Sequence, residues 1–389
     1  MLRGRFSYTG CSTAACLVSL LTALYLAAAT SVDQAATAKK PVILDSGSHD
    51  VAQVAFSHDG KLLLSADRDN TVILWNPETG KRHAEFRHES SCSAASLSHD
   101  GKILATGVTQ WIERPGPVSS PTTVPSAAVK LWDVESGKEL VLLTTGQALT
   151  NPAYSVVFSP DGKSVALGSR GPIKRDEDGQ VVLWNVEKRT EIARYSSGCG
   201  PVFSLAYSSD GKLLAAASGD HAKGTGLATV WDLGTGKVKF RIKNDDSPFV
   251  TVSFSPDAKT MAVGGGMGPD AFMKLPKVGN LSLWDVGKEK ELACLKGVTD
   301  AVRSVAFSPD GTLLASAGGN QVDDIGELIL WDVKTQKKIG TRTREDAAFT
   351  SVSFSSDAKR LAVGNMNGKI LLWQVAGLSE EKPCKEKKR

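Results

Sequence analysis

A short apolar stretch followed by a polar turn recurs seven times along the chain. Each copy places a mainly apolar triplet before Ser, a variable residue, Asp, and then Gly or Ala. The copies are VAFSHDG at 54–60, ASLSHDG at 95–101, VVFSPDG at 156–162, LAYSSDG at 205–211, VSFSPDA at 252–258, VAFSPDG at 305–311 and VSFSSDA at 352–358. Apolar β-branched and aromatic residues before a Gly-containing turn are typical of a strand that ends in a tight turn. The pattern predicts seven repeated units, each beginning with a strand.

The remainder of each unit predicts three further strands. In the sixth unit these are LLASAG at 313–318, LILWD at 328–332 and KKIGTRT at 337–343. The third strand of every unit ends near a tryptophan: Trp75, Trp132, Trp184, Trp231, Trp284, Trp331 and Trp373. A single four-stranded sheet leaves its apolar faces exposed, whereas seven sheets arranged radially cover one another. We therefore predict an all-β fold, a seven-bladed β-propeller of four-stranded antiparallel blades, over residues 39–378.

The turn phrase followed by a Leu-Trp-Asp motif, as at 330–332, resembles the WD-repeat (tryptophan–aspartate) family. The resemblance covers residues 41–376 and is to the regular repeats of bacterial members. It implies a structural hydrogen-bond network of His, Ser, Asp and Trp in each blade. Ser65, Asp69 and Trp75 keep the family spacing in the first blade, but His49 lies two residues from the expected position, and the other blades have lost more of the network.

The two ends of the repeat region predict how the ring closes. Six units have a fourth strand after their tryptophan, and the seventh has none. The segment PVILD at 41–45 lies before the first unit and has the composition of a strand. We predict that Val42, Ile43 and Leu44 supply the missing outer strand of the seventh blade, as the family resemblance implies.

The repeats differ in length at one place. From the turn Asp to the blade Trp there are 16 positions in the first unit (59 to 75) but 32 in the second (100 to 132). The extra residues of the second to sixth units all fall between the second and third strands. Propeller geometry places those connections on one face, here called the top face, and the repeated Asp-Gly turns on the opposite, bottom face. Insertions gathered on one face are typical of a binding face.

The inserted segments supply the candidate binding residues. The segment at 109–128 is expected to be a loop stiffened by four prolines, and Trp111 is either a partner anchor or a cap on its own blade. The segment at 265–280 offers an apolar, adaptable surface. The predicted partner-binding residues are Trp111, Ile112, Arg114, Lys174, Arg175, His221, Met267, Phe272, Met273, Asp323 and Asp324.

The N-terminal segment differs in character from the repeats. Arg3 and Arg5 precede the apolar run CLVSLLTALYLAAA at 16–29, and small residues follow it. This order is typical of a secretory signal peptide. Residues 1–38 are therefore predicted to be a signal peptide or a membrane anchor, and the protein to be exported (periplasmic, secreted or in the cell envelope). Residues 379–389 are predicted to be a charged, disordered tail.

Composition and motifs argue against several function classes. The net charge of +4 is small and the charges are mixed along the chain, so no nucleic-acid partner is expected. The six histidines are scattered, and zinc, phosphate-loop and hydrolase motifs are absent from the sequence, so no cofactor or metal is expected. We expect a non-enzymatic, monomeric scaffold that docks a protein or peptide on its top face.

Two alternatives come from different function classes. One is an exported hydrolase or lyase, or a small-ligand receptor, that uses the mouth of the central channel. The other is a structural element displayed on the cell envelope. The innermost strands, which read VAFS, VVFS and VSFS, are expected to line the channel with small and apolar side chains. Such a lining disfavours a metal or cofactor at the axis.

Overall fold

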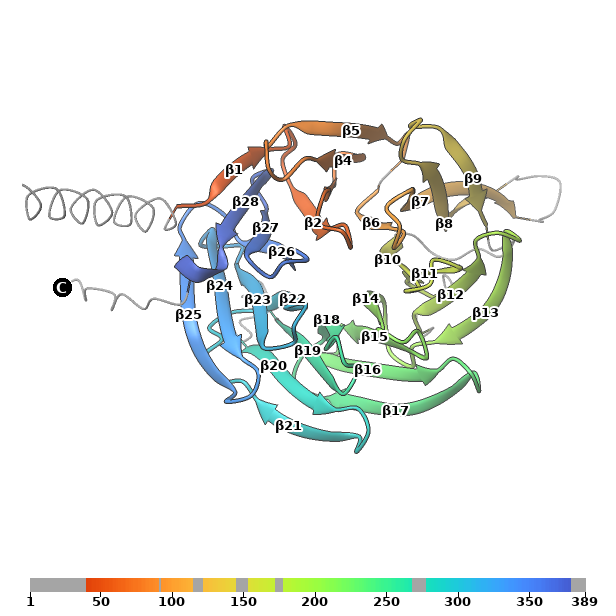
Figure 1. The fold of residues 1–389 in the computed structure, drawn as a ribbon. Helices are drawn as coiled ribbons and strands as arrows, with labels where there is room; N and C mark the ends of the chain where they lie inside the picture. The colour runs from red at the N-terminus through yellow and green to blue at the C-terminus, as the bar shows by residue number, and fades with distance from the viewer. Residues whose placement is uncertain are drawn as a thin grey trace, which may run out of the picture.

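The computed structural model describes residues 40–90, 92–114, 122–144, 153–171, 178–267 and 278–378. Their strands form seven four-stranded antiparallel sheets, arranged as blades around a central axis (Figure 1). The predicted fold class is therefore confirmed. One 3-10 turn, Val375–Gly377, follows the last strand. Over the ranges given above, the chain forms no helix of the length and apolarity needed to cross a membrane.

Within each blade the strands follow one another from the axis outward. The first blade comprises β2 (Val51–Phe56), β3 (Leu63–Asp67), β4 (Thr71–Trp75) and β5 (Arg82–Arg87). The second comprises β6 (Ala94–Leu97), β7 (Ile103–Arg114), β8 (Thr122–Asp133) and β9 (Glu139–Leu143). The third comprises β10 (Ala153–Phe158), β11 (Ser164–Ser169), β12 (Gln180–Asn185) and β13 (Thr190–Ser196).

The remaining blades repeat this order. The fourth comprises β14 (Val202–Tyr207), β15 (Leu213–Asp220), β16 (Thr225–Asp232) and β17 (Lys237–Asn244). The fifth comprises β18 (Phe249–Phe254), β19 (Thr260–Met267), β20 (Val278–Asp285) and β21 (Lys290–Cys294). The sixth comprises β22 (Val302–Phe307), β23 (Leu313–Asn320), β24 (Ile325–Asp332) and β25 (Lys337–Arg344). The seventh comprises β26 (Phe349–Phe354), β27 (Arg360–Asn365), β28 (Lys369–Gln374) and β1 (Val42–Asp45).

The hydrophobic core lies between neighbouring blades. Between the third and fourth blades, Leu183 of β12 packs in one cluster with Leu205 of β14 and Trp231 of β16. The Trp231 side chain is buried, as are Trp184 and Trp331 at the same position of their blades. The repeated tryptophan thus fills the wedge between two sheets, and this packing requires the ring because a blade alone would leave it exposed.

The turn between the first and second strands of every blade is held by the same side-chain bond. The hydroxyl of the repeated Ser donates to the carboxylate of the turn Asp over 2.5–2.7 Å. The seven pairs are Ser57–Asp59, Ser98–Asp100, Ser159–Asp161, Ser208–Asp210, Ser255–Asp257, Ser308–Asp310 and Ser355–Asp357. The Asp also accepts a bond from the backbone N–H two residues later, as at Lys61. Ser and Asp therefore recur because both close the turn, whereas the residue between them is free to vary.

The ring is closed by the predicted N-terminal strand. β1 pairs antiparallel with β28, with Val42 opposite Leu372 and Leu44 opposite Ile370. The Leu44 side chain is buried in a cluster that includes Ile370 of the seventh blade and Trp75 of the first. The prediction that residues 42–44 supply the missing outer strand is confirmed.

The second-blade insertion extends the sheet, and the expectation of an irregular loop over 109–128 is wrong in this respect. β7 and β8 stay paired from Ile103 opposite Asp133 to Arg114 opposite Thr122. Pro125 lies within β8, opposite Trp111. A proline is tolerated here because the far end of a hairpin is a sheet edge, where an N–H is not needed for a third strand. The insertion is therefore a β-hairpin that extends beyond the blade on the top face.

Candidate functional site

Trp111 lies on the β7–β8 hairpin with its side chain in solvent. Its exposed fraction is 67%, the highest among the large hydrophobic residues described. The sequence left open whether it anchors a partner or caps its own blade, and this exposure excludes the cap. A large aromatic side chain exposed on an extended hairpin is of the type that dominates interface energetics.

His221 lies in the turn between β15 and β16, beside an aromatic row. Its ring centroid is 5.4 Å from that of Phe203, and the Phe203 centroid is 5.3 Å from that of Tyr154. Partial burial and the positive charge of Arg303 lower the pKa of His221, against the opposing charge of Asp220. The neutral imidazole therefore predominates at neutral pH, as part of an aromatic wall at the top of the fourth blade.

Asp323 and Asp324 lie in the turn between β23 and β24. The side-chain amide of Asn320 donates its N–H to the Asp323 carboxylate. Its side-chain oxygen, Oδ1, accepts from the backbone N–H of Val322 over 2.8 Å. Asp324 has a positive φ of 53°, a conformation that Asp tolerates in tight turns. These contacts give both residues a structural part in the turn, and any contact with a partner stays a prediction.

The other predicted site residues are not tested by the structure. Ile112 and Arg114 belong to β7 and Met267 ends β19, but their side chains lie outside the described part. Lys174, Arg175, Phe272 and Met273 fall in ranges outside the described residues altogether. Their partner-binding role stays a prediction.

A cluster of charged and aromatic residues that the sequence analysis missed lies at the top end of the axis. This mouth cluster consists of Asp50 and Arg68 of the first blade, Tyr154 of the third, Phe203 and His221 of the fourth and Arg303 of the sixth. Arg68 Nε and Asp50 Oδ2 form an ion pair of 3.0 Å. Arg303 is close enough to Arg68, Asp50 and His221 for their charges to perturb one another. Side chains from opposite sides of the ring thus meet at the mouth.

Arg303 lacks a partner for part of its side chain. Its Nε is shielded from solvent and has no hydrogen-bond partner among the described residues, and the same holds for Oδ1 of Asp50. Burial and repulsion by Arg68 lower the pKa of Arg303, against the attraction of Asp50. Burial also raises the pKa of Asp50, against the opposing charges of Arg68 and Arg303. A half-buried guanidinium without full pairing favours any anion that can reach it.

The mouth corrects the expectation of a channel lined by small apolar side chains. That expectation considered only the VAFS-type phrases. Each phrase starts two residues after the first axis-facing position of its inner strand. Two positions before each phrase, the seven units carry Ala52, Ser93, Tyr154, Phe203, Val250, Arg303 and Thr350. Comparison of the repeats at this position would have revealed the mouth residues, because it is the first axis-facing position of each inner strand.

The polar network that the resemblance implies is present in part. The Trp75 indole N–H donates to Ser65 over 2.9 Å, and Trp132 and Trp331 donate to Thr106 and Ser316 over 3.0 Å each. His88 packs edge-on against Trp132, with ring centroids 5.2 Å apart. Neither His88 ring nitrogen has a partner among the described residues, and burial lowers its pKa to about 4. These residues brace the blades.

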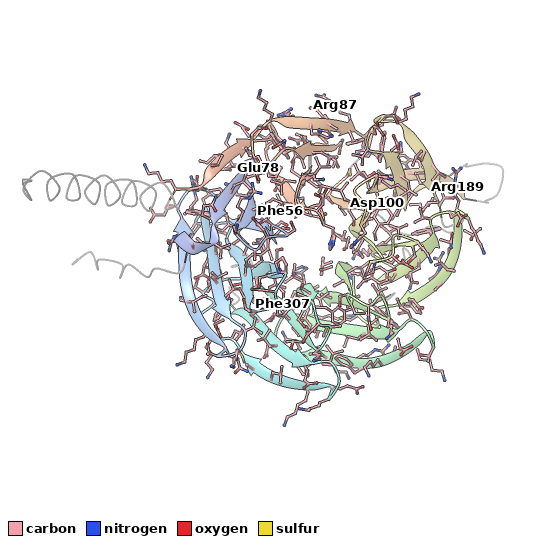
Figure 2. All side chains as sticks on the ribbon, viewed as in Figure 1. Phe56, Glu78, Arg87, Asp100, Arg189 and Phe307 are labelled. Carbon is pink, nitrogen blue, oxygen red and sulfur yellow. The ribbon has the colours of Figure 1, made fainter. Side chains whose placement is uncertain are left out.

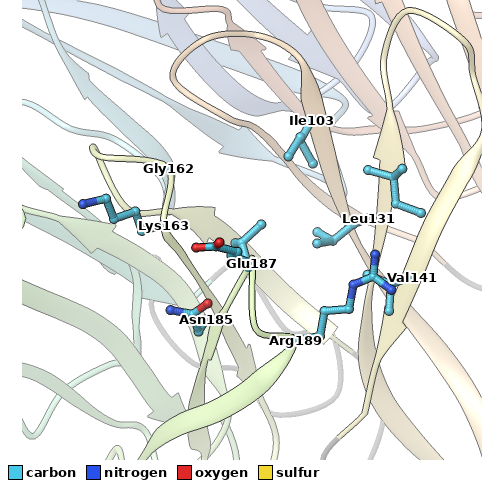
Figure 3. A pocket seen from close by; sticks show the side chains of 10 residues that line it. Ile103, Leu131, Val141, Gly162, Lys163, Asn185, Glu187 and Arg189 are labelled. Carbon is cyan, nitrogen blue, oxygen red and sulfur yellow. The ribbon is translucent and has the colours of Figure 1, made fainter.

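A separate cavity of about 370 Å³ lies between the second and third blades, away from the mouth (Figure 3). Ile103, Leu131 and Val141 supply its apolar wall from the second blade. The third blade contributes Lys163 from its Asp-Gly turn and Arg189 from the turn between β12 and β13, both on the bottom face. In the described ranges, no three His, Cys, Asp or Glu side chains are grouped so that they could hold a metal ion.

Known proteins resemble the chain in its repeats. The family model described as "WD domain, G-beta repeat" matches residues 41–76, 190–222, 289–322 and 336–374. The chain contains WD40 repeats. The WD40 segments include both the closing strand β1 and its neighbour β28, which supports the WD-repeat resemblance at the point of ring closure.

Three relatives of the chain carry the same name. Eukaryotic translation initiation factor 3 subunit I of Homo sapiens is 22% identical over 325 residues, covering 72% of this chain and 93% of the relative. The Culex quinquefasciatus protein of that name is 22% identical over 329 residues, covering 72% and 94%. The Nematostella vectensis protein is 22% identical over 306 residues, covering 72% and 93%.

These relatives correct two expectations. The expectation of an exported protein is wrong, because the relatives are named as subunits of a translation initiation factor. A basic start and a short apolar run describe only the composition of residues 1–38, which lie outside the described residues, and composition does not fix a destination. The narrower resemblance to bacterial members is not confirmed, because these relatives are eukaryotic.

Proposed function

We propose that this chain is a non-enzymatic, monomeric member of the WD-repeat family, in which residues 39–378 form a scaffold that docks a protein or peptide on the top face. The observation that carries the proposal is the 67% exposure of Trp111 on a hairpin that extends beyond its blade. An exposed tryptophan gains most when a partner buries it. The hairpin holds it in a paired strand, so less conformational entropy is lost on binding than from a free loop.

Two further observations support docking on this face. The top-face hairpins differ in length from blade to blade, whereas the bottom turns repeat one design, and variation on one face is typical of partner recognition. Each relative is by its name a subunit, one part of a larger assembly. A propeller that joins an assembly needs a surface that distinguishes its partner from other proteins.

The test is site-specific photocrosslinking in the full-length protein. A photoreactive amino acid replaces Trp111 in one version and Arg189, on the bottom face, in the matched control. We expect a defined protein to be captured from position 111 and not from position 189. The purified partner should then bind the unmodified chain and bind Trp111→Ala at least about tenfold more weakly, the loss typical of a hot-spot aromatic.

A second variant separates binding from folding. Residues 109–127 are replaced by Asn-Gly, which joins Val108 to Ala128 through a two-residue hairpin turn. This variant should keep its melting temperature and lose the partner. Equal capture from both faces, or unchanged binding without the hairpin, would contradict the proposal.

A further inference from the structure

The mouth cluster has more positive charge than its own acids neutralise. Arg68 is paired with Asp50, but Arg303 forms no ion pair with a described acid. Two other acids near the mouth have partners of their own. Asp69 accepts the backbone N–H of His49 over 3.0 Å, and Asp220 forms an ion pair with Lys223 over 3.5 Å. The guanidinium of Arg303 is therefore left without a full counter-charge.

We propose that the mouth of the propeller binds a carboxylate of an acidic peptide segment, with Arg303 and Arg68 as its charged partners. This inference rests on the proposed function, because it specifies the chemistry of one segment docked on the top face. A carboxylate accepts parallel hydrogen bonds from the amino groups of a guanidinium and supplies the counter-charge that Arg303 lacks.

The surroundings of Arg303 favour a peptide over a free anion. Tyr154 and Phe203 form an edge-to-face pair that walls the mouth on the side of the third and fourth blades. Their rings offer apolar surface to the residue beside the bound carboxylate. Burial raises the pKa of Tyr154, against the opposing charges of Arg170 and Arg68, so its hydroxyl stays protonated and able to donate a hydrogen bond.

The charge balance favours a carboxylate over a phosphate. Arg170, at the rim of the third blade, is exposed and already solvated. The shielded charge in excess is therefore that of Arg303 alone, and one carboxylate neutralises it. A phosphate near its dianionic form would bring a second charge next to the half-buried Asp50, which costs desolvation and repulsion.

The test uses defined peptides and the full-length protein. The probe is fluorescein-labelled Gly-Ser-Phe-Glu-Ser-Gly, compared with versions carrying Gln or phosphoserine in place of Glu. Fluorescence anisotropy at pH 7.5 reports binding. We expect the Glu peptide to bind at least about tenfold more tightly than the Gln peptide. A hydrogen bond between charged groups in a partly buried site contributes free energy of this size. The preference should weaken as salt is raised.

The matched variants remove one positive charge each. Arg303→Gln should abolish the preference for Glu over Gln, and Arg68→Gln should reduce it about threefold, as expected for a more exposed cation. Arg87→Gln is the control. Arg87 lies on β5 at the outer rim, far from the axis (Figure 2), and its loss should leave the preference unchanged.

Three outcomes overturn the inference. They are equal binding of the Glu and Gln peptides, an unchanged preference in a folded Arg303→Gln protein, or tighter binding of the phosphoserine peptide than of the Glu peptide. Circular dichroism checks the fold of each variant, and Arg68→Gln, at an exposed position, supplies the test if Arg303→Gln unfolds. Capture of a partner from position 111 without a Glu preference would overturn this inference and leave the proposed function intact.

Discussion

The two faces of the propeller are built on different principles. On the bottom face the same Ser–Asp bond closes the inner turn of all seven blades. On the top face several buried polar groups have no hydrogen-bond partner among the described residues: Asp67, His88, Ser169 and Arg303. The bottom face is thus defined by local turn chemistry that each repeat brings with it. The top face depends on which residues of different blades happen to meet.

This difference separates stability from recognition. A turn that satisfies its own polar groups contributes to folding and offers little to a partner. A buried polar group without a partner is destabilising until a ligand or a neighbour satisfies it. The top face therefore keeps buried polar groups that reduce the stability of the free protein.

Deletion of residues 40–46 should give the largest effect, because it opens the ring that holds both faces in place. The loss of β1 removes the buried Leu44 and exposes the edge of β28. The free energy of unfolding should fall by at least about 3 kcal/mol, from one buried leucine and the lost strand pairing. Urea titration measures it. In the same strand, Ile43→Ala is the control, since this side chain is 51% exposed and its loss should cost less than about 1 kcal/mol.

A pair of serine variants tests the comparison directly. Ser308 is buried on the bottom face, donates to Asp310 and accepts from the Leu313 N–H. Ser308→Ala should destabilise by about 1–3 kcal/mol, because it leaves a buried donor unsatisfied. Ser169 is equally buried on the top face and has no hydrogen-bond partner among the described residues, so Ser169→Ala should leave the stability unchanged or raise it by up to about 1 kcal/mol. Equal losses in urea titration would remove the distinction between the faces.

A pair of aspartate variants should show opposite pH dependence. Burial raises the pKa of Asp67 to about 6, against the partial effect of the nearby Ser48 and Ser46 hydroxyls. The folded state therefore binds more protons than the unfolded state between pH 4 and 6, and stability falls as pH rises through this window. Asp67→Asn should stabilise by about 1–2 kcal/mol at pH 7.5 and have little effect at pH 4.

The bottom-face counterpart of Asp67 is Asp59. The Ser57 hydroxyl and the Lys61 N–H lower the pKa of Asp59, so its contribution is present above its unfolded pKa and is lost as pH falls through its lower folded value. Asp59→Asn should destabilise slightly at pH 7.5 and lose this effect in acid. Thermal melts from pH 3 to 8 measure both variants, and the same sign for the two would contradict the assignment.

The smallest effect is expected from exchanging Gly and Ala in the bottom-face turns. Ala258 occupies the place of the repeated Gly, with a φ of +58°. Ala258→Gly should stabilise by about 0.5 kcal/mol, because glycine adopts this conformation without strain but loses more entropy on folding. Gly311→Ala, at a φ of +71° in the neighbouring blade, is the reverse test and should destabilise by about 1 kcal/mol. If both variants melt at the same temperature as the unmodified protein, the turn tolerates either residue.

The sequence predicted the fold because the bottom-face chemistry is local. Ser308, Asp310 and Gly311 define a turn within four residues, and Trp331 marks the strand that packs against the preceding blade. Seven such units leave little choice of architecture. The closing strand was predictable for the same reason. The seventh unit lacked an outer strand, and residues 41–45 formed a predicted strand that belonged to no unit.

The mouth cluster was not predicted because it is non-local. Asp50, Phe203 and Arg303 come from three blades, and their proximity depends on the ring and not on any one repeat. The hairpin of the second blade was placed on the correct face, but its pairing up to Arg114 was missed. Prolines in the segment were interpreted as signs of a loop, and Pro125 instead occupies the edge of a strand.

The pairing of β1 with β28 also constrains the order of events during synthesis. Val42 is translated early, and Leu372, its partner, follows 330 positions later. Until then the first strand has no neighbour in its own sheet, while the six intervening blades are complete in sequence and able to stack on one another. The ring can therefore close only when β28 has been made and captures β1. A ribosome that stalls before residue 369 leaves an open, six-bladed arc with an uncovered apolar sheet face at each end, a species prone to aggregate.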